Sequence, residues 1–136
     1  MKIKLAFYIS LICMLTIPFY AQGPEATKGK IFTVANAYAF QEILDKNEFV
    51  VVDFYANWCS PCASMHKVID TLAQQKDLEH IVFVKVNVEE QKTLADRYHI
   101  RGLPTLMFFV DGQPIRTIHG YVDKKELKVI IQKTFF

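Results

Sequence analysis

The chain has 136 residues, of which 51% are hydrophobic and 22% are charged, and its mean hydropathy is +0.14. This length fits one domain, and the composition excludes a disordered, collagen-like or low-complexity chain. The net charge of +2 is too small to indicate a nucleic-acid-binding protein. Three cysteines are too few for a disulfide scaffold, and their odd number requires an explanation.

The first 21 residues have the pattern of a secretory signal peptide. Lys2 and Lys4 precede an apolar run over residues 5–17, which Pro18 ends. The run is short for a bilayer span, which needs about 20 apolar residues. We therefore predict cleavage after Ala21 and an exported protein, periplasmic or secreted. The alternative is a protein that an uncleaved signal anchors in the membrane.

Removal of residues 1–21 would change both the charge and the cysteine count. The two lysines of the leader account for the whole excess of basic over acidic residues. Cys13 also leaves with it, and lipid attachment there is disfavoured because bulky Ile12 precedes the cysteine. The remaining pair, Cys59 and Cys62, would lie in a compartment where disulfides form and persist.

The segment after the leader begins with a polar stretch and continues into regular structure. Residues 22–30 carry two glycines and a proline, so they are expected to form a flexible lead-in to one domain over residues 31–136. A strand at 31–34 is followed by a helix that Asn36 caps and that runs to about residue 46. The strand at 49–55 is apolar almost throughout, which is typical of a strand buried on both faces of a sheet.

The second half of the domain continues the alternation of strands and helices. We expect a helix at about 60–75, a strand at 81–88 and a short helix at about 90–99. Strands at 105–110 and 115–119 are joined by Asp111-Gly112, a hairpin signal, and Asp123 caps a last helix. The order βαβαβαββα predicts an α/β fold, with a central mixed sheet flanked by helices on both faces.

The segment Trp58-Cys59-Ser60-Pro61-Cys62 lies between the central strand and the long helix. Two cysteines at this spacing can close a small disulfide without unfolding the backbone around them. The helix N-terminus carries a partial positive charge, which favours a thiolate at Cys59. Proline is tolerated in the first turn because its missing N–H would be unpaired there anyway.

Two other interpretations of this cysteine pair are open. A structural zinc site usually has four Cys or His ligands, and His66 is the one histidine near the pair in sequence. A purely structural disulfide is possible, but so short a loop restricts the unfolded chain little. Redox chemistry is favoured over both.

With these motifs the chain resembles the thioredoxin family. The resemblance covers about residues 31–136 and implies the thioredoxin fold and thiol–disulfide oxidoreductase chemistry with no metal or organic cofactor. It rests on four segments in this order: residues 51–62 (VVDFYANWCSPC), 85–88 (KVNV), 100–105 (IRGLPT) and Gly120.

The resemblance implies roles for four residues at the reacting end of the domain. Cys59 would attack a substrate disulfide as the nucleophile, and Cys62 would resolve the mixed disulfide. Asp53 would be the buried carboxylate that exchanges a proton with Cys62, and Lys85 would lie near that carboxylate. The apolar flanks of Asp53 agree, because a buried charge requires a partner or a raised pKa.

Four further residues would bind the substrate. Pro104 matches the cis-proline that faces the disulfide, and it would expose the backbone beside Leu103 to an extended substrate segment. Trp58 would shield the disulfide and offer an apolar contact, and Gly120 would lie on the same surface. The implied partners are disulfide-containing proteins, with the protein itself a monomer.

The chain departs from the family pattern at two places, and the direction of electron flow is open. Ser60-Pro61 replaces the familiar Gly-Pro, and Lys67 stands near the position of a mid-helix proline, which predicts a straighter helix. Asp53 and the Leu103-Pro104 pair favour a protein-disulfide reductase supplied with electrons by a membrane thiol carrier. The alternatives are a disulfide oxidase or isomerase, and a non-catalytic binding or chaperone module.

Overall fold

The computed structural model describes residues 30–136, so the predicted signal peptide and almost all of the lead-in lie outside the described residues. The elements follow the predicted order, with one added 3₁₀ turn, η1. They are β1 (Ile31–Thr33), α2 (Ala37–Lys46), β2 (Phe49–Tyr55), α3 (Ser60–Leu72), η1 (Lys76–Leu78), β3 (Ile81–Asn87), α4 (Lys92–Arg97), β4 (Thr105–Val110), β5 (Gln113–His119) and α5 (Lys124–Phe135).

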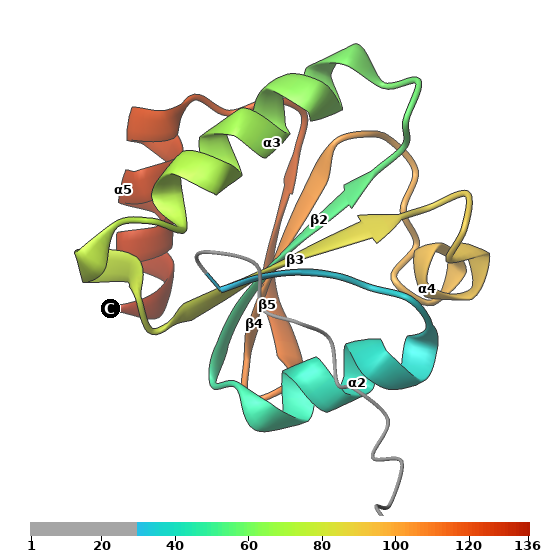
Figure 1. Cartoon of the computed structure of the whole chain (residues 1–136), viewed down its shortest axis with the longest axis horizontal. Coiled ribbons are helices and arrows are strands. Elements are labelled where there is room, and N and C mark those ends of the chain that lie inside the picture. Colours follow the sequence, from blue (N-terminus) through green and yellow to red (C-terminus); the bar gives the residue numbers. More distant parts are fainter. Residues whose placement is uncertain (1–29) are drawn as a thin grey trace, which may run out of the picture.

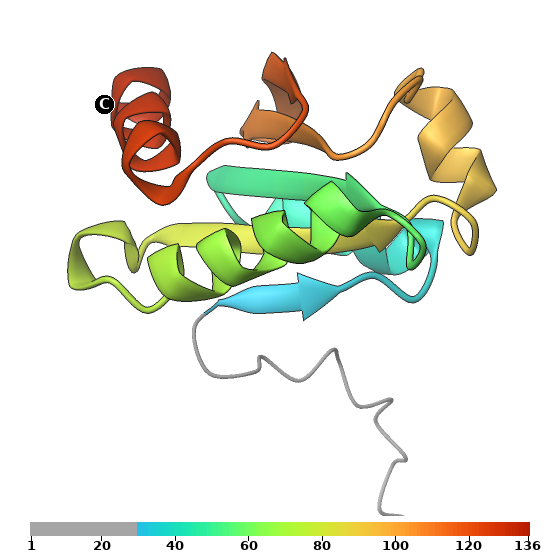
Figure 2. The same cartoon turned by 90° about the horizontal axis from the view of Figure 1, so that it is seen from above.

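The strands form one five-stranded sheet in the order β1-β3-β2-β4-β5, which Figure 2 shows from above. The strands β1, β3 and β2 are parallel, whereas β4 is antiparallel to β2 and β5 is antiparallel to β4. Helices α3 and α5 cover one face, and α2 and α4 lie on the other (Figure 1). The predicted α/β thioredoxin fold, with a mixed sheet between helices, is confirmed.

The alternation of side chains along β2 divides the core between the two faces. Val51 packs with the apolar side chains of α3 and α5, whereas Val50, Val52 and Phe54 pack with those of α2 and α4. Successive residues of a strand point to opposite faces, so Asp53 shares the α3 face with Val51. The strand thus places a carboxyl group inside the sheet–helix interface.

Most of the predicted caps and turns are observed. The side chain of Asn36 accepts a 2.8 Å hydrogen bond from the Ala39 N–H at the start of α2. Asp123 does the same at the start of α5, where it accepts a 3.0 Å bond from the N–H of Glu126. Asp111 and Gly112 both have positive φ, 49° and 75°, as a tight hairpin turn requires.

Two helices are shorter than the sequence predicts. Helix α3 ends at Leu72 rather than near residue 75. The chain then turns through η1, which places Leu78 in the core, and a longer α3 would not allow this turn. Helix α4 ends at Arg97, and His99 adopts a positive φ of 54° that a helix cannot contain. Within residues 30–136, no helix has the length and apolar character that a membrane crossing requires.

Candidate active site

The two cysteines form a disulfide at the start of α3, with their Cα atoms 5.3 Å apart. Cys59 is the N-cap residue, and its Sγ accepts a hydrogen bond of 3.3 Å from the backbone N–H of Cys62. Pro61 lies in the first turn, as predicted. The sulfur of Cys59 therefore meets the positive end of the helix, which favours its thiolate form after reduction.

Three of the residues predicted to bind the substrate, Leu103, Pro104 and Gly120, lie close to one another, and Leu103 packs against the cysteine pair. The Leu103-Pro104 peptide bond is cis, and the Gly120 N–H donates a 2.8 Å hydrogen bond to the Pro104 carbonyl. The Thr105 hydroxyl donates to the Gly102 carbonyl at 2.8 Å and lies 3.1 Å from Nδ1 of His119. These contacts fix the loop before β4 against β5.

Trp58 is the exposed member of the site. Its side chain is 71% exposed, and its Nε1–H donates a 3.1 Å hydrogen bond to Oε1 of Glu89. Together with Val88 and Leu103 it lines an open groove with a volume of about 400 Å³. An apolar surface held in place by a polar contact is suited to binding a polypeptide.

Asp53 lies on the α3 side of β2 and is completely buried. Burial raises the pKa of its carboxyl group above the ordinary value of 3.8, and the nearby His66 and Lys85 oppose that rise. Apart from His66, neither carboxyl oxygen has a hydrogen-bond partner within residues 30–136. A carboxyl group whose pKa is raised in this way is suited to accept and return a proton.

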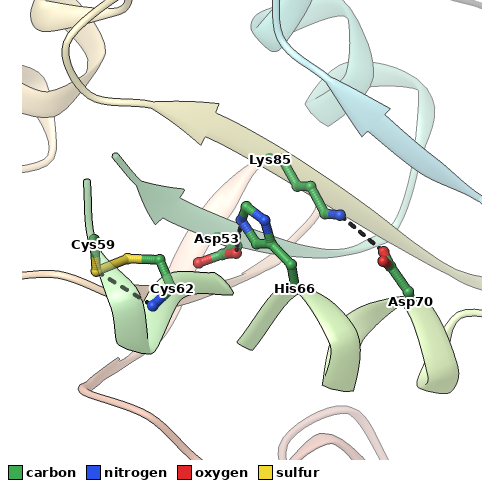
Figure 3. Close-up of polar contacts among 6 residues, drawn as sticks. All are labelled: Asp53, Cys59, Cys62, His66, Asp70 and Lys85. Atoms are coloured by element: carbon green, nitrogen blue, oxygen red, sulfur yellow. Dashed lines mark hydrogen bonds and ion pairs between the residues drawn. A yellow bond between two sulfur atoms is a disulfide. The ribbon is translucent and has the colours of Figure 1, made fainter. Parts of the chain in front are cut away.

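Two side chains of α3, His66 and Asp70, are part of the polar cluster that contains Asp53 and Lys85 (Figure 3). His66 Nε2 lies 3.1 Å from Asp53 Oδ2, within ion-pair distance. Lys85 lies opposite Asp53 in the register of β2 and β3, and its Nζ donates a 2.8 Å hydrogen bond to Asp70 Oδ1. The charge of the lysine is therefore directed to the helix rather than to the buried carboxyl group.

Sequence reasoning considered His66 only as a zinc ligand and missed Asp70. A signal for both was present: Cys62, His66 and Asp70 follow one another at four-residue spacing, so they lie on one face of α3. The strand alternation places Asp53 and Lys85 opposite that face. Among the described residues, no group of three or more His, Cys, Asp or Glu side chains is arranged to hold a metal ion.

The chemistry of the site follows from these positions. A disulfide at a helix start can be opened to a dithiol whose first thiol is activated, while a buried carboxyl group takes up the proton of the second. Exposed Trp58 precedes the cysteine pair, and Leu103 packs against it. These features define a thiol–disulfide oxidoreductase.

Comparison with known proteins identifies the family. The thioredoxin family model matches residues 30–133. Thioredoxin 1 of Synechococcus elongatus is 42% identical over 100 residues, which cover 74% of this chain and 92% of the relative. A thioredoxin of Mycoplasmoides gallisepticum is 37% identical over 99 residues, covering 73% and 97%.

Solved structures agree with the sequence comparison. A mutant thioredoxin from Halobacterium salinarum superposes with a TM-score of 0.72 at 33% identity, covering 80% of this chain and 94% of that one. The thioredoxin of Malassezia sympodialis gives 0.71 at 30% identity, with 85% and 96% covered. The chain belongs to the thioredoxin family.

Proposed function

We propose that the protein reduces disulfide bonds of other proteins outside the cytoplasm. The observation that carries the proposal is buried Asp53, a carboxyl group on the same face of the sheet as the helix that bears Cys59 and Cys62. Reduction of a substrate requires that Cys62 lose a proton after the mixed disulfide has formed. A buried carboxylate with a raised pKa supplies the base for that step.

The reaction would proceed in two displacements. The Cys59 thiolate attacks one sulfur of the substrate disulfide, forming a mixed disulfide and releasing the other substrate sulfur as a thiolate. Cys62 gives its proton to Asp53, and its thiolate attacks Cys59 Sγ. This second displacement closes the Cys59–Cys62 disulfide and releases the second substrate thiol. The dithiol loses two electrons, and the substrate gains them.

The substrate would bind as an extended segment beside the loop that contains Pro104. Leu103 packs against the cysteine pair, and Gly120 bonds to the neighbouring Pro104 carbonyl. The groove that Trp58 and Leu103 line has room for a side chain of the substrate. We assign Trp58 and Leu103 to apolar contacts and the backbone near Leu103 to strand-like pairing. In this function the protein acts as a monomer.

Export and the supply of electrons belong to the same proposal. The leader pattern at residues 1–21 supports an exported protein, periplasmic or secreted, or one anchored by an uncleaved signal. A reductant in an oxidising compartment requires electrons, and a membrane thiol carrier is a source that reaches it. Cell fractionation and the mass of the N-terminal peptide test location and cleavage after Ala21.

A second candidate, an oxidase or isomerase, is favoured by one observation. Ser60-Pro61 stands between the cysteines where the family pattern has Gly-Pro, and this dipeptide helps to set the reduction potential. Equilibration of the Cys59–Cys62 couple with a glutathione buffer decides between them. A potential near −270 mV is expected of a reductant, and one near −120 mV would indicate a strong oxidant, on the approximate scale of the fold.

Trapping of partners tests the catalytic mechanism itself. A Cys62→Ser variant should accumulate mixed disulfides with proteins of its own compartment, whereas a matched Cys59→Ser variant should accumulate far fewer. Absence of any mixed disulfide, with Cys59 still reactive toward alkylating reagents, would reject this mechanism. Full biological activity of the Cys59→Ala, Cys62→Ala double variant would instead indicate a binding module.

A further inference from the structure

His66 is the polar side chain that contacts the buried carboxyl group. Its Nε2 atom is buried, lies 3.1 Å from Asp53 Oδ2, and has no other hydrogen-bond partner within residues 30–136. The side chain as a whole is 25% exposed, whereas that of Asp53 is 1% exposed. The imidazole ring therefore spans the distance between the buried carboxyl group and the surface.

The ring is held in this position from two directions. Its parent helix α3 fixes the backbone four residues after Cys62. The ring of Tyr55, at the end of β2, meets the imidazole edge to face with centroids 4.6 Å apart and an angle of 80°. An aromatic contact of this geometry stabilises one orientation of the imidazole, so its approach to Asp53 is built into the fold.

The other charged groups near Asp53 do not offer the same route. Lys85, from β3, is engaged with Asp70 at 2.8 Å, and both belong to the surroundings that shift the pKa of Asp53. A lysine ammonium stays protonated near neutral pH, whereas an imidazole gains and loses a proton there. Tyr55, from β2, contacts the imidazole ring, and the pKa of Tyr55 is raised by burial and by Glu90.

We infer that His66 is a positioning residue for the thiol–disulfide reaction, which orients Asp53 and passes protons between that carboxyl group and solvent. The inference rests on the role proposed for Asp53. When Cys62 gives its proton to Asp53, the carboxylic acid passes a proton from Oδ2 to Nε2 of His66. The imidazolium then releases the proton on its other ring nitrogen to water. The same relay runs backwards when the disulfide is reduced.

A pH-jump experiment isolates the step at which His66 would act. The mixed disulfide between Cys59 and an aromatic nitrobenzoate thiol is prepared in acid, where Cys62 stays protonated. After a jump to pH 7 in a stopped-flow instrument, release of the coloured thiolate reports only the attack by Cys62. His66→Phe keeps a ring against Tyr55, and His66→Gln keeps an N–H donor near Asp53, but neither side chain can relay a proton.

We expect release to slow about tenfold in both variants, a small share of the 10²- to 10⁴-fold effects of general acid–base groups. The attack of Cys59 on the free reagent should change less than twofold. In His66→Ala, added imidazole should restore the rate in proportion to its concentration. A His80→Ala variant, which changes an exposed histidine before β3, should behave as the unmodified protein.

The Asp53→Asn variant separates the two levels of the argument. Slow release in Asp53→Asn and no further slowing in Asp53→Asn, His66→Gln would support a relay through both residues. Normal release in Asp53→Asn would reject the role of Asp53 and with it the relay. If release is slow in Asp53→Asn but normal in the His66 variants, the relay role of His66 is rejected and the proposed function stands. The same holds if His66→Ala is slow and added imidazole does not restore its rate.

Discussion

Replacement of Asp53 by Asn should stabilise the oxidised protein at neutral pH and change its stability little in acid. The carboxyl group is completely buried, and its pKa is raised by burial above the ordinary 3.8. Taking an ionised carboxylate out of water costs several kcal/mol. An amide in its place has polar groups without partners, which costs about 1–3 kcal/mol. The difference predicts a net gain of about 2 kcal/mol at pH 8.

The sign of the pH dependence follows from the direction of the pKa shift. Below pH 3.8 the group is protonated in the folded and the unfolded chain, so its contribution to stability is fully present. As the pH rises, the unfolded chain loses its proton first, and stability falls by about 1.4 kcal/mol per pH unit. The fall ends once the pH has passed the raised pKa of the folded state.

Urea unfolding of both proteins from pH 3.5 to pH 8 measures this difference. Other carboxyl groups titrate equally in the two proteins, so the difference in unfolding free energy isolates Asp53 and its pairing with His66. We expect the urea midpoint of the variant to be higher by about 1 M at pH 8. An equal gain at both ends of the range, or a loss at pH 8, would refute the assignment of a costly buried charge.

Two further changes test the core and the substrate surface. Leu127 of α5 is completely buried, so Leu127→Ala should lower the unfolding free energy by about 2–5 kcal/mol. The control Val129→Ala, at a position that is 41% exposed, should change the unfolding free energy by less than about 0.5 kcal/mol. Equal losses in urea titrations of the two variants would contradict the assigned core. Trp58→Ala should raise KM for a protein disulfide about tenfold. It should not lower the unfolding free energy, because the side chain is 71% exposed. An unchanged KM would show that Trp58 is not part of the binding surface.

The order of elements could be predicted because the local signals agree with the tertiary packing. The run at residues 49–55, which is apolar except for Asp53, predicted a central strand, and β2 has neighbours on both sides. Asn36, Asp123 and the Asp111-Gly112 turn act through contacts within a few residues, which the sequence contains directly. The end of α3 depended on Leu78, whose burial is a tertiary property. Local periodicity therefore extended the helix too far.

The candidate site could be predicted where the family pattern names a residue, and less well where a contact joins distant segments. The disulfide and the cis bond at Pro104 occur where the resemblance implied them. The spacing along α3 could point to the face that carries Asp70, but the contact between Asp70 and Lys85 could not be predicted, because the register of β2 and β3 sets the position of the lysine. Pairwise contacts across three elements are not visible in any one window of sequence.

The arrangement of charges on α3 gives buried Asp53 a neighbour, His66, whose own charge can change. Asp70 engages Lys85 at 2.8 Å, so the permanent positive charge is held away from the oxygens of Asp53. A lysine ion pair at those oxygens would favour the carboxylate and lower its pKa, which would weaken it as a base for Cys62. An imidazole at 3.1 Å exerts that effect only while it is protonated. Because Cys62, His66 and Asp70 are four residues apart, they follow one another along one face of α3. Cys62 supplies the thiol, His66 can gain or lose a charge, and Asp70 holds the ion pair with Lys85.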